Sequence, residues 1–305
     1  MGNSSMFQNN TTITLTISSK IVQFIQWTLI PSITGFIFFL CFITIIFSVF
    51  FKTPALWENA RYVLFVFLLI NDTLYVFLGF YFMLASMYLL HIPVPLCYIL
   101  YTLSGGSFKV TPCNLAAMAV EQYIAICHPL RHAELCTPQR ANAVFTMICS
   151  LVMIQYVAEF CVMASSMTNI FNLYIVCQKE GLVVNTIQNI IRAVSLILCF
   201  MAIGVIIIFT YVKVMQVANK VCPQSSSASK AGRTVIIHAF QILLCTSPLL
   251  ATYTKDYITK WPEFLPIVYF FAFTCLPRFL NPLVYGIRDE TLRQYLKKSL
   301  SRYFC

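Results

Sequence analysis

The residues of this chain that could do chemistry are ionisable side chains set inside long apolar stretches. Asp72 follows Leu68-Leu69-Ile70 and precedes Leu74-Tyr75-Val76. A carboxylate at the centre of a bilayer costs roughly 2.5–3.5 kcal/mol, so Asp72 needs a partner, a cavity or protonation. Lys109 lies too deep in a later apolar stretch to reach the surface by snorkelling, and we expect it to line a wet internal cavity. These residues predict binding by charge and hydrogen bonding.

Sequence patterns typical of enzymes and metal centres are absent. The chain has no His-Glu-x-x-His, no Walker loop, no Gly-x-Ser-x-Gly and no Cys-x-x-Cys. Its four histidines are too scattered in the sequence to suggest a ligand set: His91, His128, His132 and His238. We therefore expect no enzymatic activity, no metal and no cofactor.

The composition predicts a membrane protein. Hydrophobic residues make up 59% of the 305 residues and charged residues only 10%, which is far from the composition of soluble domains. A helix needs about 20 apolar residues to cross a bilayer. Seven stretches are long enough: Thr28–Phe51, Tyr62–Leu89, Leu96–Cys127, Asn142–Ser165, Asn185–Tyr211, Thr234–Tyr253 and Phe264–Ile287. The sequence thus predicts an all-α seven-transmembrane helix bundle over residues 28–287, without the internal repeat of many transporters.

The basic residues predict how the bundle is oriented. With the N-terminus outside, the inner segments carry thirteen lysines and arginines and the outer segments carry four. The positive-inside rule favours this orientation, so the net charge of +10 reflects topology and not a nucleic-acid partner. Residues 1–27 would form an extracellular tail, in which Asn3, Asn9 and Asn10 begin glycosylation sequons.

Polar residues near the outer ends of two spans predict a water-filled vestibule. At the start of the fifth span, polar residues recur at spacings of three and four, which places them on one helical face unless this segment is a loop: Asn185, Gln188, Asn189, Arg192 and Ser195. Glu159, near the outer end of the fourth span, would either pair with Lys109 or lie at the level of the headgroups. A cavity facing these groups would avoid the cost of exposing them to lipid.

Two segments are candidates for motion at the inner side. The basic, serine-rich stretch from Tyr211 to Thr234 is typical of a flexible linker. Pro248 removes a backbone hydrogen bond from the sixth span and permits a kink there. Residues 288–305 would form a cytoplasmic tail with a short amphipathic helix lying on the membrane surface.

Three motifs resemble those of one receptor family. The stretch Met118–His132, MAVEQYIAICHPLRH, resembles the signature Met-Ala-x-Asp/Glu-Arg-Tyr-x-Ala-Ile-Cys-x-Pro-Leu-Arg-Tyr of vertebrate odorant receptors, a branch of the rhodopsin-like (class A) G-protein-coupled receptors. The run from Lys230 to Thr234, with His238, resembles their sixth-helix motif, and the run from Asn281 to Tyr285 resembles the seventh-helix Asn-Pro-x-x-Tyr. The resemblance covers nearly the whole chain, and its local forms are similar to the fish-type subfamily.

The resemblance implies a disulfide bond and a ligand site. Cys97 and Cys177 correspond to the pair that joins the third helix to the second outer loop. We expect an outer-half cavity among helices three, five, six and seven, lined by Ser104, Gly105, Phe108, Lys109, Gln188, Arg192 and Tyr253. Lys109 and Arg192 together indicate an anionic, water-soluble ligand such as a carboxylate or a sulfate.

The resemblance also implies which residues couple to a G protein and switch the bundle: Glu121, Gln122, Tyr123, Pro248, Asn281, Pro282 and Tyr285. Gln122 stands where the family has an arginine, and its neutral amide cannot make the charged hydrogen bonds of a guanidinium. This substitution leaves Glu121 without that partner and puts coupling strength and basal activity in doubt. Thr246 stands where the family has a tyrosine in the sixth helix.

Arg278 stands where the resemblance implies a cation-binding cluster around Asp72. We therefore hypothesise that its guanidinium replaces a bound sodium ion and pairs directly with Asp72 inside the membrane. Such a buried ion pair would offset the free-energy cost of placing the carboxylate in the bilayer.

The function that the sequence predicts is odorant binding at the plasma membrane of sensory cilia. The expected partners are a small odorant, a stimulatory heterotrimeric G protein of the olfactory type that raises cAMP, and membrane lipids. Two alternatives remain: a non-olfactory heptahelical receptor for a peptide or a lipid, and a weakly signalling decoy, which Gln122 favours.

Overall fold

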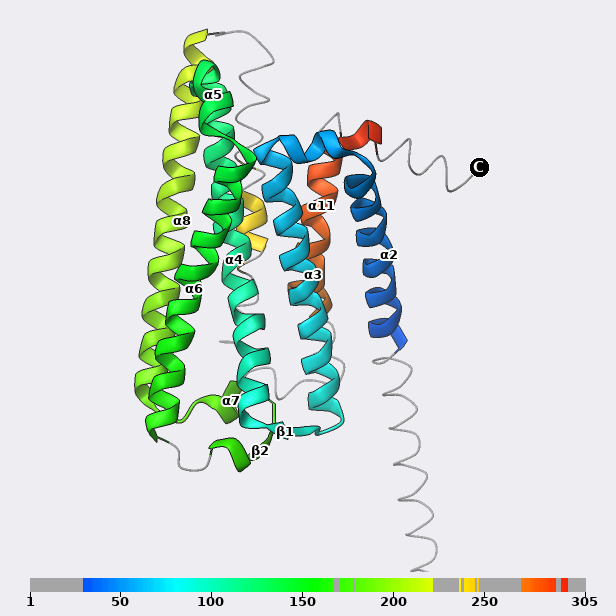
Figure 1. Ribbon diagram of the computed structural model, residues 1–305, viewed down its shortest axis with the longest axis vertical. Helices are drawn as coiled ribbons and strands as arrows, with labels where there is room; N and C mark the ends of the chain where they lie inside the picture. The colour runs from blue at the N-terminus through cyan, green and yellow to red at the C-terminus, as the bar shows by residue number, and fades with distance from the viewer. Residues whose placement is uncertain are drawn as a thin grey trace, which may run out of the picture.

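The computed structural model describes residues 30–166, 170–177, 179–221, 236, 239–244, 246, 270–288 and 292–295. In this part of the chain, long helices lie side by side and form a bundle (Figure 1). The long helices are α2 (Ile30–Lys52), α3 (Ala60–Met87), α4 (Val94–Cys127), α6 (Pro138–Ser166), α8 (Thr186–Val221) and α11 (Leu276–Arg288). The short elements are η2 (Pro54–Glu58), β1 (His91–Pro93), α5 (Pro129–Leu135), η3 (Ile170–Asn172), β2 (Tyr174–Val176), α7 (Lys179–Leu182) and the π-helix η4 (Phe270–Cys275).

Prolines and short polar side chains set several helix ends. Pro129 opens α5 directly after α4 ends, because proline cannot donate the backbone hydrogen bond that would continue α4. At the start of α6, the backbone N–H of Arg140 donates to Oγ1 of Thr137 at 3.3 Å. At the start of α8, the backbone N–H of Ile187 donates to Oδ1 of Asn185 at 3.2 Å. Both are N-cap contacts, which satisfy backbone donors of the first helical turn.

The first four spans predicted from the sequence correspond to α2, α3, α4 and α6, with ends that differ by a few residues. The fifth predicted span is too short: α8 continues from Tyr211 to Val221, through residues whose composition is typical of a flexible linker. These residues contain no glycine or proline before Pro223, so nothing in them stops the helix. Figure 1 shows this extension of α8 projecting beside α5.

The predicted sixth and seventh spans are described only in part. Of Thr234–Tyr253, residues 236, 239–244 and 246 are helical, and Pro248 and Tyr253 lie outside the described residues. Of Phe264–Ile287, the described part begins with η4 and continues as α11. The wide π turn comes directly before Pro277, whose missing N–H and bulky ring disfavour a regular α-helical turn there.

The pattern of burial is that of a bundle whose solvent is lipid. Ile37, Leu151 and Ile197 are more than half exposed on the outside of their helices, whereas Asp72 and Glu159 are fully buried. Four described helices, α2, α3, α6 and α8, are long and apolar enough to cross a membrane by length and composition. Polar groups therefore lie inside the bundle and apolar groups face outward, as expected in hydrocarbon.

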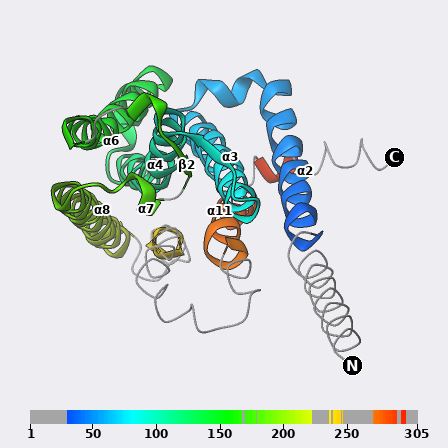
Figure 2. The same ribbon diagram turned by 90° about the horizontal axis from the view of Figure 1, so that it is seen from below.

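Helix α4 is the central helix of the described bundle. Figure 2 shows it between α3 on one side and the pair α6 and α8 on the other. Because of this position, α4 buries many of its polar side chains against other helices, among them Thr102, Lys109, Asn114 and Glu121. Neighbouring helices shield these groups from lipid.

Two short strands and a disulfide bond close one end of the bundle, which we call the outer end because the sequence predicts that it faces outside the cell; the opposite end is called the inner end. β1 pairs antiparallel with β2, and Ile92 lies opposite Ile175. A disulfide bond joins Cys97, at the start of α4, to Cys177, directly after β2. Nearby, the hydroxyl of Tyr98 donates to the backbone oxygen of Tyr156 at 2.5 Å and so ties α4 to α6. The loop between α6 and α8 is thereby held over the outer end of α4.

Gly105 permits the close approach of α4 and α6. A Cβ atom at position 105 would collide with the hydroxyl oxygen of Tyr156, a side chain that is only 3% exposed. We expect Gly105→Ala to destabilise the protein by about 1–3 kcal/mol, the usual cost of overpacking a close contact. The change should lower the midpoint of thermal unfolding of the purified protein in detergent.

Gly204→Ala is the matched control for this prediction. Gly204 lies on α8, and a Cβ atom there has open space around it. Because alanine favours a helix over glycine by about 1 kcal/mol, Gly204→Ala should leave the midpoint unchanged or raise it. An equal loss in both variants would contradict the proposed contact between Gly105 and Tyr156.

Candidate ligand-binding and signalling sites

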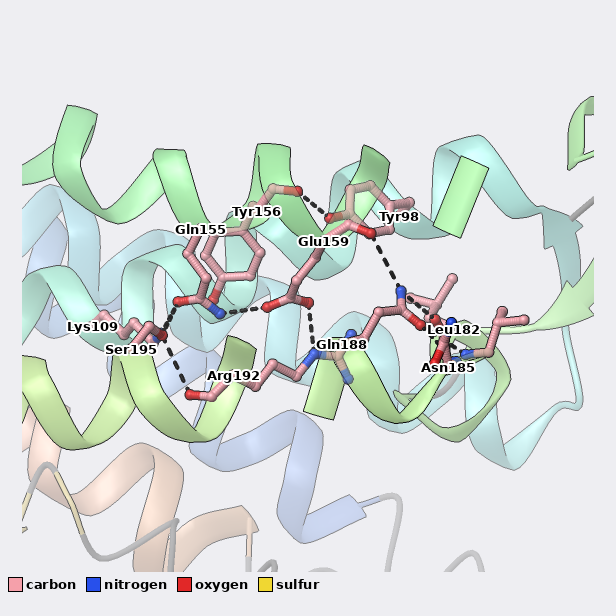
Figure 3. A network of polar contacts seen from close by, with 11 residues as sticks. Tyr98, Lys109, Gln155, Tyr156, Glu159, Leu182, Asn185, Gln188, Arg192 and Ser195 are labelled. Atoms are coloured by element: carbon pink, nitrogen blue, oxygen red, sulfur yellow. Dashed lines mark hydrogen bonds and ion pairs between the residues drawn. The ribbon is translucent and has the colours of Figure 1, made fainter. Parts of the chain in front are cut away.

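A chain of polar contacts joins α4, α6 and α8 in the outer half of the bundle (Figure 3). Nζ of Lys109 donates to Oε1 of Gln155 and to Oγ of Ser195, the latter at 2.7 Å. Nε2 of Gln155 in turn donates to Oε1 of Glu159. Nε of Arg192 lies 2.6 Å from Oε2 of Glu159 and closes the chain. The acid that the sequence assigned either to Lys109 or to the headgroups thus contacts Arg192 directly and Lys109 only through Gln155.

Arg192 retains hydrogen-bonding capacity in this chain of contacts. Its Nη1 and Nη2 atoms are buried and have no hydrogen-bond partner among the described residues. Its guanidinium carbon lies 5.0 Å from the centre of the Tyr101 ring, which is cation–π distance. A buried donor without a partner costs about 1–3 kcal/mol, so these two atoms are ready to bind an acceptor.

The other residues expected in the ligand cavity lie in several places. Gln188 is fully buried, and its amide contacts backbone groups of Leu182, Val184, Asn185 and Glu159, which gives it a structural role at the start of α8. Phe108 faces α3, with its ring centre 6.1 Å from that of Tyr75. Gly105 faces Tyr156 on α6, Ser104 is half-buried on α4, and Tyr253 lies outside the described residues.

Lys109 lines a cavity of about 710 Å³, but its position differs from the expected one. The cavity is bounded by α6 and α8, with α4 as its floor, and reaches the inner end of α3 and α5. The expectation placed Lys109 among helices three, five, six and seven. In the structure its ammonium group contacts Ser195 on α8, the fifth span, and also Gln155 on α6, the fourth span, which the expected cavity did not include. Which neighbour a residue faces depends on the rotation of its helix, which the sequence alone left open.

A second polar cluster lies at the centre of the bundle around Asp72. Oδ1 of Asp72 accepts from Oγ1 of Thr111 at 2.7 Å, and Oδ2 accepts from Nδ2 of Asn281 at 2.7 Å. Nη1 of Arg278 lies 3.4 Å from Oδ1 of Asp72, and the guanidinium carbon lies 4.7 Å from the centre of the Tyr75 ring. Both charged side chains are 1% exposed. This arrangement compensates an acid inside the membrane with a base from another helix.

A third cluster surrounds Glu121 at the inner end of α4. Nε of Arg61, from the start of α3, lies 3.0 Å from Oε2 of Glu121. Nε2 of His132, from α5, lies 2.9 Å from Oε1 of the same carboxylate. Glu121 and Gln122 are both buried. Glu121 is thus held by residues of two helices other than its own, α3 and α5, and is followed in sequence by the neutral Gln122.

The remaining expected coupling and switch residues are placed as follows. Tyr123 lies on the inner part of α4, with its ring centre 5.6 Å from that of Phe209 on α8. Asn281 and Pro282 are buried in α11, and the backbone of Tyr285 belongs to the same helix. Pro248 and the sequon residues Asn3, Asn9 and Asn10 lie outside the described residues. Their roles stay predictions.

Several residues of these clusters were missed by the sequence analysis. Gln155 lies four residues before Glu159, and a polar pair at this spacing in an apolar span is a signal that would have found it. Tyr101 and Arg61 carry no such signal. Arg61 looks like one more basic residue of the inner side, and its contact with Glu121 follows only from how α3 and α4 pack.

Asp72 and Arg278 provide a prediction about the stability of the bundle. Removing one member of a buried ion pair leaves the other charge uncompensated, which costs about 3–5 kcal/mol. We expect Asp72→Ala and Arg278→Ala each to lower the yield of folded protein and its thermal unfolding midpoint. The decrease in the unfolding midpoint of the double variant should be much smaller than the sum of the decreases in the two single variants.

Arg131→Ala, at an exposed arginine of α5, is the control and should have little effect on the unfolding midpoint. Additive losses in the double variant would rule out a direct interaction between Asp72 and Arg278.

Comparison with known proteins agrees with this architecture. The model of the family described as 7 transmembrane receptor (rhodopsin family) matches residues 43–285. Odorant receptor 131-2 of Danio rerio is 31% identical over 217 residues, which are 69% of this chain and 66% of that protein. Olfactory receptor 52A5 of Homo sapiens is 28% identical over 198 residues, 60% of this chain and 61% of the relative. Olfactory receptor 14A16 of Homo sapiens is 25% identical over 186 residues, 59% of each chain.

The matched regions therefore span less than two thirds of the length of these curated relatives. The family match covers the helices that carry all three polar clusters, from α2 to α11. The family is one of receptors and not of enzymes. The chain is a multi-pass membrane protein that belongs to the rhodopsin family of seven-transmembrane receptors, and the relatives named above are odorant receptors.

Proposed function

We propose that this protein is a G-protein-coupled odorant receptor of the plasma membrane of sensory cilia, with its N-terminus outside the cell. A small water-soluble odorant binds in the outer half of the bundle, and a stimulatory G protein of the olfactory type binds at the inner face and raises cAMP. The names of the relatives and the three receptor-like motifs support the odorant class. The observation that carries the ligand site is the pair of buried, unpartnered guanidinium donors of Arg192.

The charge of the outer cluster supports an anionic odorant; this cluster is the chain of polar contacts among Lys109, Gln155, Glu159, Arg192 and Ser195. Lys109, Glu159 and Arg192 together carry one formal positive charge, and they are joined by hydrogen bonds through Gln155. An odorant with a single negative charge would neutralise the cluster inside the membrane. A carboxylate or a sulfate can also accept two parallel hydrogen bonds from a guanidinium, which favours these groups over a lone hydroxyl.

Binding at Arg192 would act on the bundle through Glu159. The Arg192–Glu159 contact joins α8 to α6, and an anion that binds Arg192 competes with Glu159 for the same guanidinium. The odorant therefore favours an arrangement in which α6 and α8 are less tightly joined. A ligand shifts such an equilibrium only by its difference in affinity for the two arrangements, and no covalent step is needed.

At the inner face, signalling requires that the contacts of Glu121 change. Arg61 and His132 hold α3 and α5 against α4 in the structure described here. A G protein that inserts at this face would have to separate these elements. The receptor stays inactive as long as Glu121 keeps both partners, even though Gln122 replaces the family arginine.

Two other functions compete with this proposal. A non-olfactory heptahelical receptor for a peptide or a lipid would have the same fold, and expression outside sensory neurons would favour it. A decoy that binds odorant without signalling is favoured by Gln122. Absence of a cAMP response to any odorant, both in this chain and in its Gln122→Arg variant, would favour the decoy.

Arg192→Gln tests the ligand site. In cells that supply an olfactory-type stimulatory G protein, we expect carboxylate and sulfate odorants to raise cAMP through the unmodified receptor. Because hydrogen bonds to a charged group contribute about 1.5–3 kcal/mol, Arg192→Gln should raise the half-maximal concentration roughly 10- to 100-fold. Arg192→Lys keeps the charge but not the paired donors, and its loss should be intermediate.

Asn189→Gln is the matched control for Arg192, because Asn189 is an exposed residue of the same helix one turn earlier. It should leave the response unchanged. Surface labelling of each variant separates loss of binding from loss of folded receptor. An Arg192→Gln receptor that reaches the surface and responds normally to anionic odorants would contradict the ligand site.

Arg61→Gln tests the inner cluster. Removing this guanidinium takes away one of the two partners of Glu121 and weakens the contact between α3 and α4. We expect a higher level of cAMP in the absence of odorant, in proportion to the amount of receptor at the cell surface. His132→Gln should have the same direction of effect, because it removes the other partner.

Arg140→Gln serves as the control for this measurement, since Arg140 is an exposed arginine of the inner side on α6. Its basal cAMP should equal that of the unmodified receptor. Equal basal cAMP in the Arg61 and Arg140 variants would show that the Glu121 contacts do not restrain the receptor.

A further inference from the structure

Two free thiols meet between α4 and α8, in a place that the proposed function does not use. Sγ of Cys113 lies 3.5 Å from Sγ of Cys199. Neither residue belongs to the disulfide bond at the outer end, and both are partly accessible. Each lies one helical turn beyond a residue of the outer cluster, since Cys113 follows Lys109 by four positions and Cys199 follows Ser195 by four.

The two helices hold these thiols in a fixed register. Contacts between α4 and α8 recur at a constant separation of 86 residues: Lys109 with Ser195, Cys113 with Cys199, and Cys127 with Lys213. The rings of Tyr123 and Phe209, with the same separation, lie 5.6 Å apart. A parallel pair of helices that keeps one register over this length cannot move one thiol away without shifting the other contacts.

The thiols can be reached from the lipid side of the bundle. Cys113 and Cys199 both line the cavity of about 710 Å³ that has α4 as its floor. Its rim carries Met147, Leu151 and Leu198, which are each more than half exposed. A small neutral molecule dissolved in the membrane therefore has access to both sulfur atoms. Lys109 lines the same cavity, and a nearby cation stabilises the reactive thiolate.

We propose that Cys113 and Cys199 form an oxidisable pair that a peroxide converts into a second disulfide bond, joining α4 to α8. One thiol attacks hydrogen peroxide, whose O–O bond breaks; the sulfur becomes a sulfenic acid and water leaves. The second thiol then attacks the sulfenic sulfur, the S–S bond forms, and a second water leaves. Two thiols are oxidised by two electrons in all, and one peroxide is reduced to two water molecules.

The geometry favours this pair over other cysteines of the described chain. The two sulfurs have to approach from 3.5 Å to the roughly 2.05 Å of a disulfide bond, which small side-chain rotations can provide. By contrast, Cys41 on α2 and Cys161 on α6 are exposed on the surface of the bundle. Because α8 carries Arg192, the new bond would restrain the helix through which the odorant acts; this consequence rests on the proposed function, whereas the bond itself does not.

Peptide mass spectrometry on the purified full-length receptor tests the bond directly. After treatment with hydrogen peroxide in detergent or nanodiscs, we expect a Cys113–Cys199 linked peptide whose mass is lower by two hydrogen atoms than the sum of the two peptides. The link should disappear on reduction with a phosphine. It should be absent in Cys113→Ser and in Cys199→Ser, and it should persist in the matched control Cys161→Ser.

Two results would overturn the proposal: no Cys113–Cys199 link in folded receptor, or a predominant link between Cys113 and Cys149, a free cysteine of α6. Thermal unfolding of each serine variant shows that it is folded, and the unmodified receptor provides the test where a variant is not. The consequence is measured separately, as loss of the odorant-induced cAMP response in proportion to the linked fraction and its absence in Cys199→Ser. A link without that loss would refute the signalling role and leave the oxidisable pair intact.

Discussion

A carboxylate inside a bilayer has to be compensated, and this requirement organises the described bundle at three depths. Each of its three buried acids lies within salt-bridge distance of a base from another element. Near the outer end, Glu159 and Arg192 join α6 to α8. At the centre, Asp72 and Arg278 join α3 to α11. At the inner end, Glu121 joins α4 to α3 through Arg61 and to α5 through His132. Apolar packing alone distinguishes poorly between helix arrangements in lipid, since hydrocarbon solvates all apolar surfaces alike. The polar contacts therefore contribute much of the specificity of this bundle.

The bounds of most long helices could be predicted from the sequence, whereas most neighbours of these buried groups could not. Helix bounds agreed within a few residues for α2, α3, α4 and α6, because the length of an apolar run and the prolines beside it determine where a membrane helix lies. The end of α8 was missed because the basic, polar residues after Tyr211 form a helix as readily as a linker until Pro223. Lys109 is buried in the bundle, and its direction toward α6 and α8 depends on the rotation of α4 and on the position of Gln155. Each further residue of an α-helix is rotated by about 100° about the helix axis. The neighbours of a side chain therefore depend on how its helix is rotated, and the composition of the sequence does not reveal that rotation.

The resemblance to odorant receptors supplied what local reasoning could not. It paired Asp72 with the position of Arg278 across some two hundred residues of sequence, and the structure brings these side chains to 3.4 Å. It did not indicate Arg61 or His132, because in the family pattern the acid corresponding to Glu121 is followed by an arginine. A pattern learned from relatives is informative where this chain follows it. Where the chain departs from it, as at Gln122, only packing between elements far apart in the sequence reveals the substitute.

The substitution at Gln122 changes which parts of the protein the inner acid holds together. An arginine directly after the acid can form an ion pair with it inside a single helix. Such a contact does not depend on the positions of neighbouring helices. Here Glu121 takes its partners from the start of α3 and from α5, so its compensation depends on the position of two neighbouring elements. Separating either element leaves a carboxylate that is 5% exposed with one partner fewer, which is costly in a low-dielectric setting. The pairing that the resemblance implies within α4 is thus replaced, in this chain, by contacts that join α4 to α3 and α5.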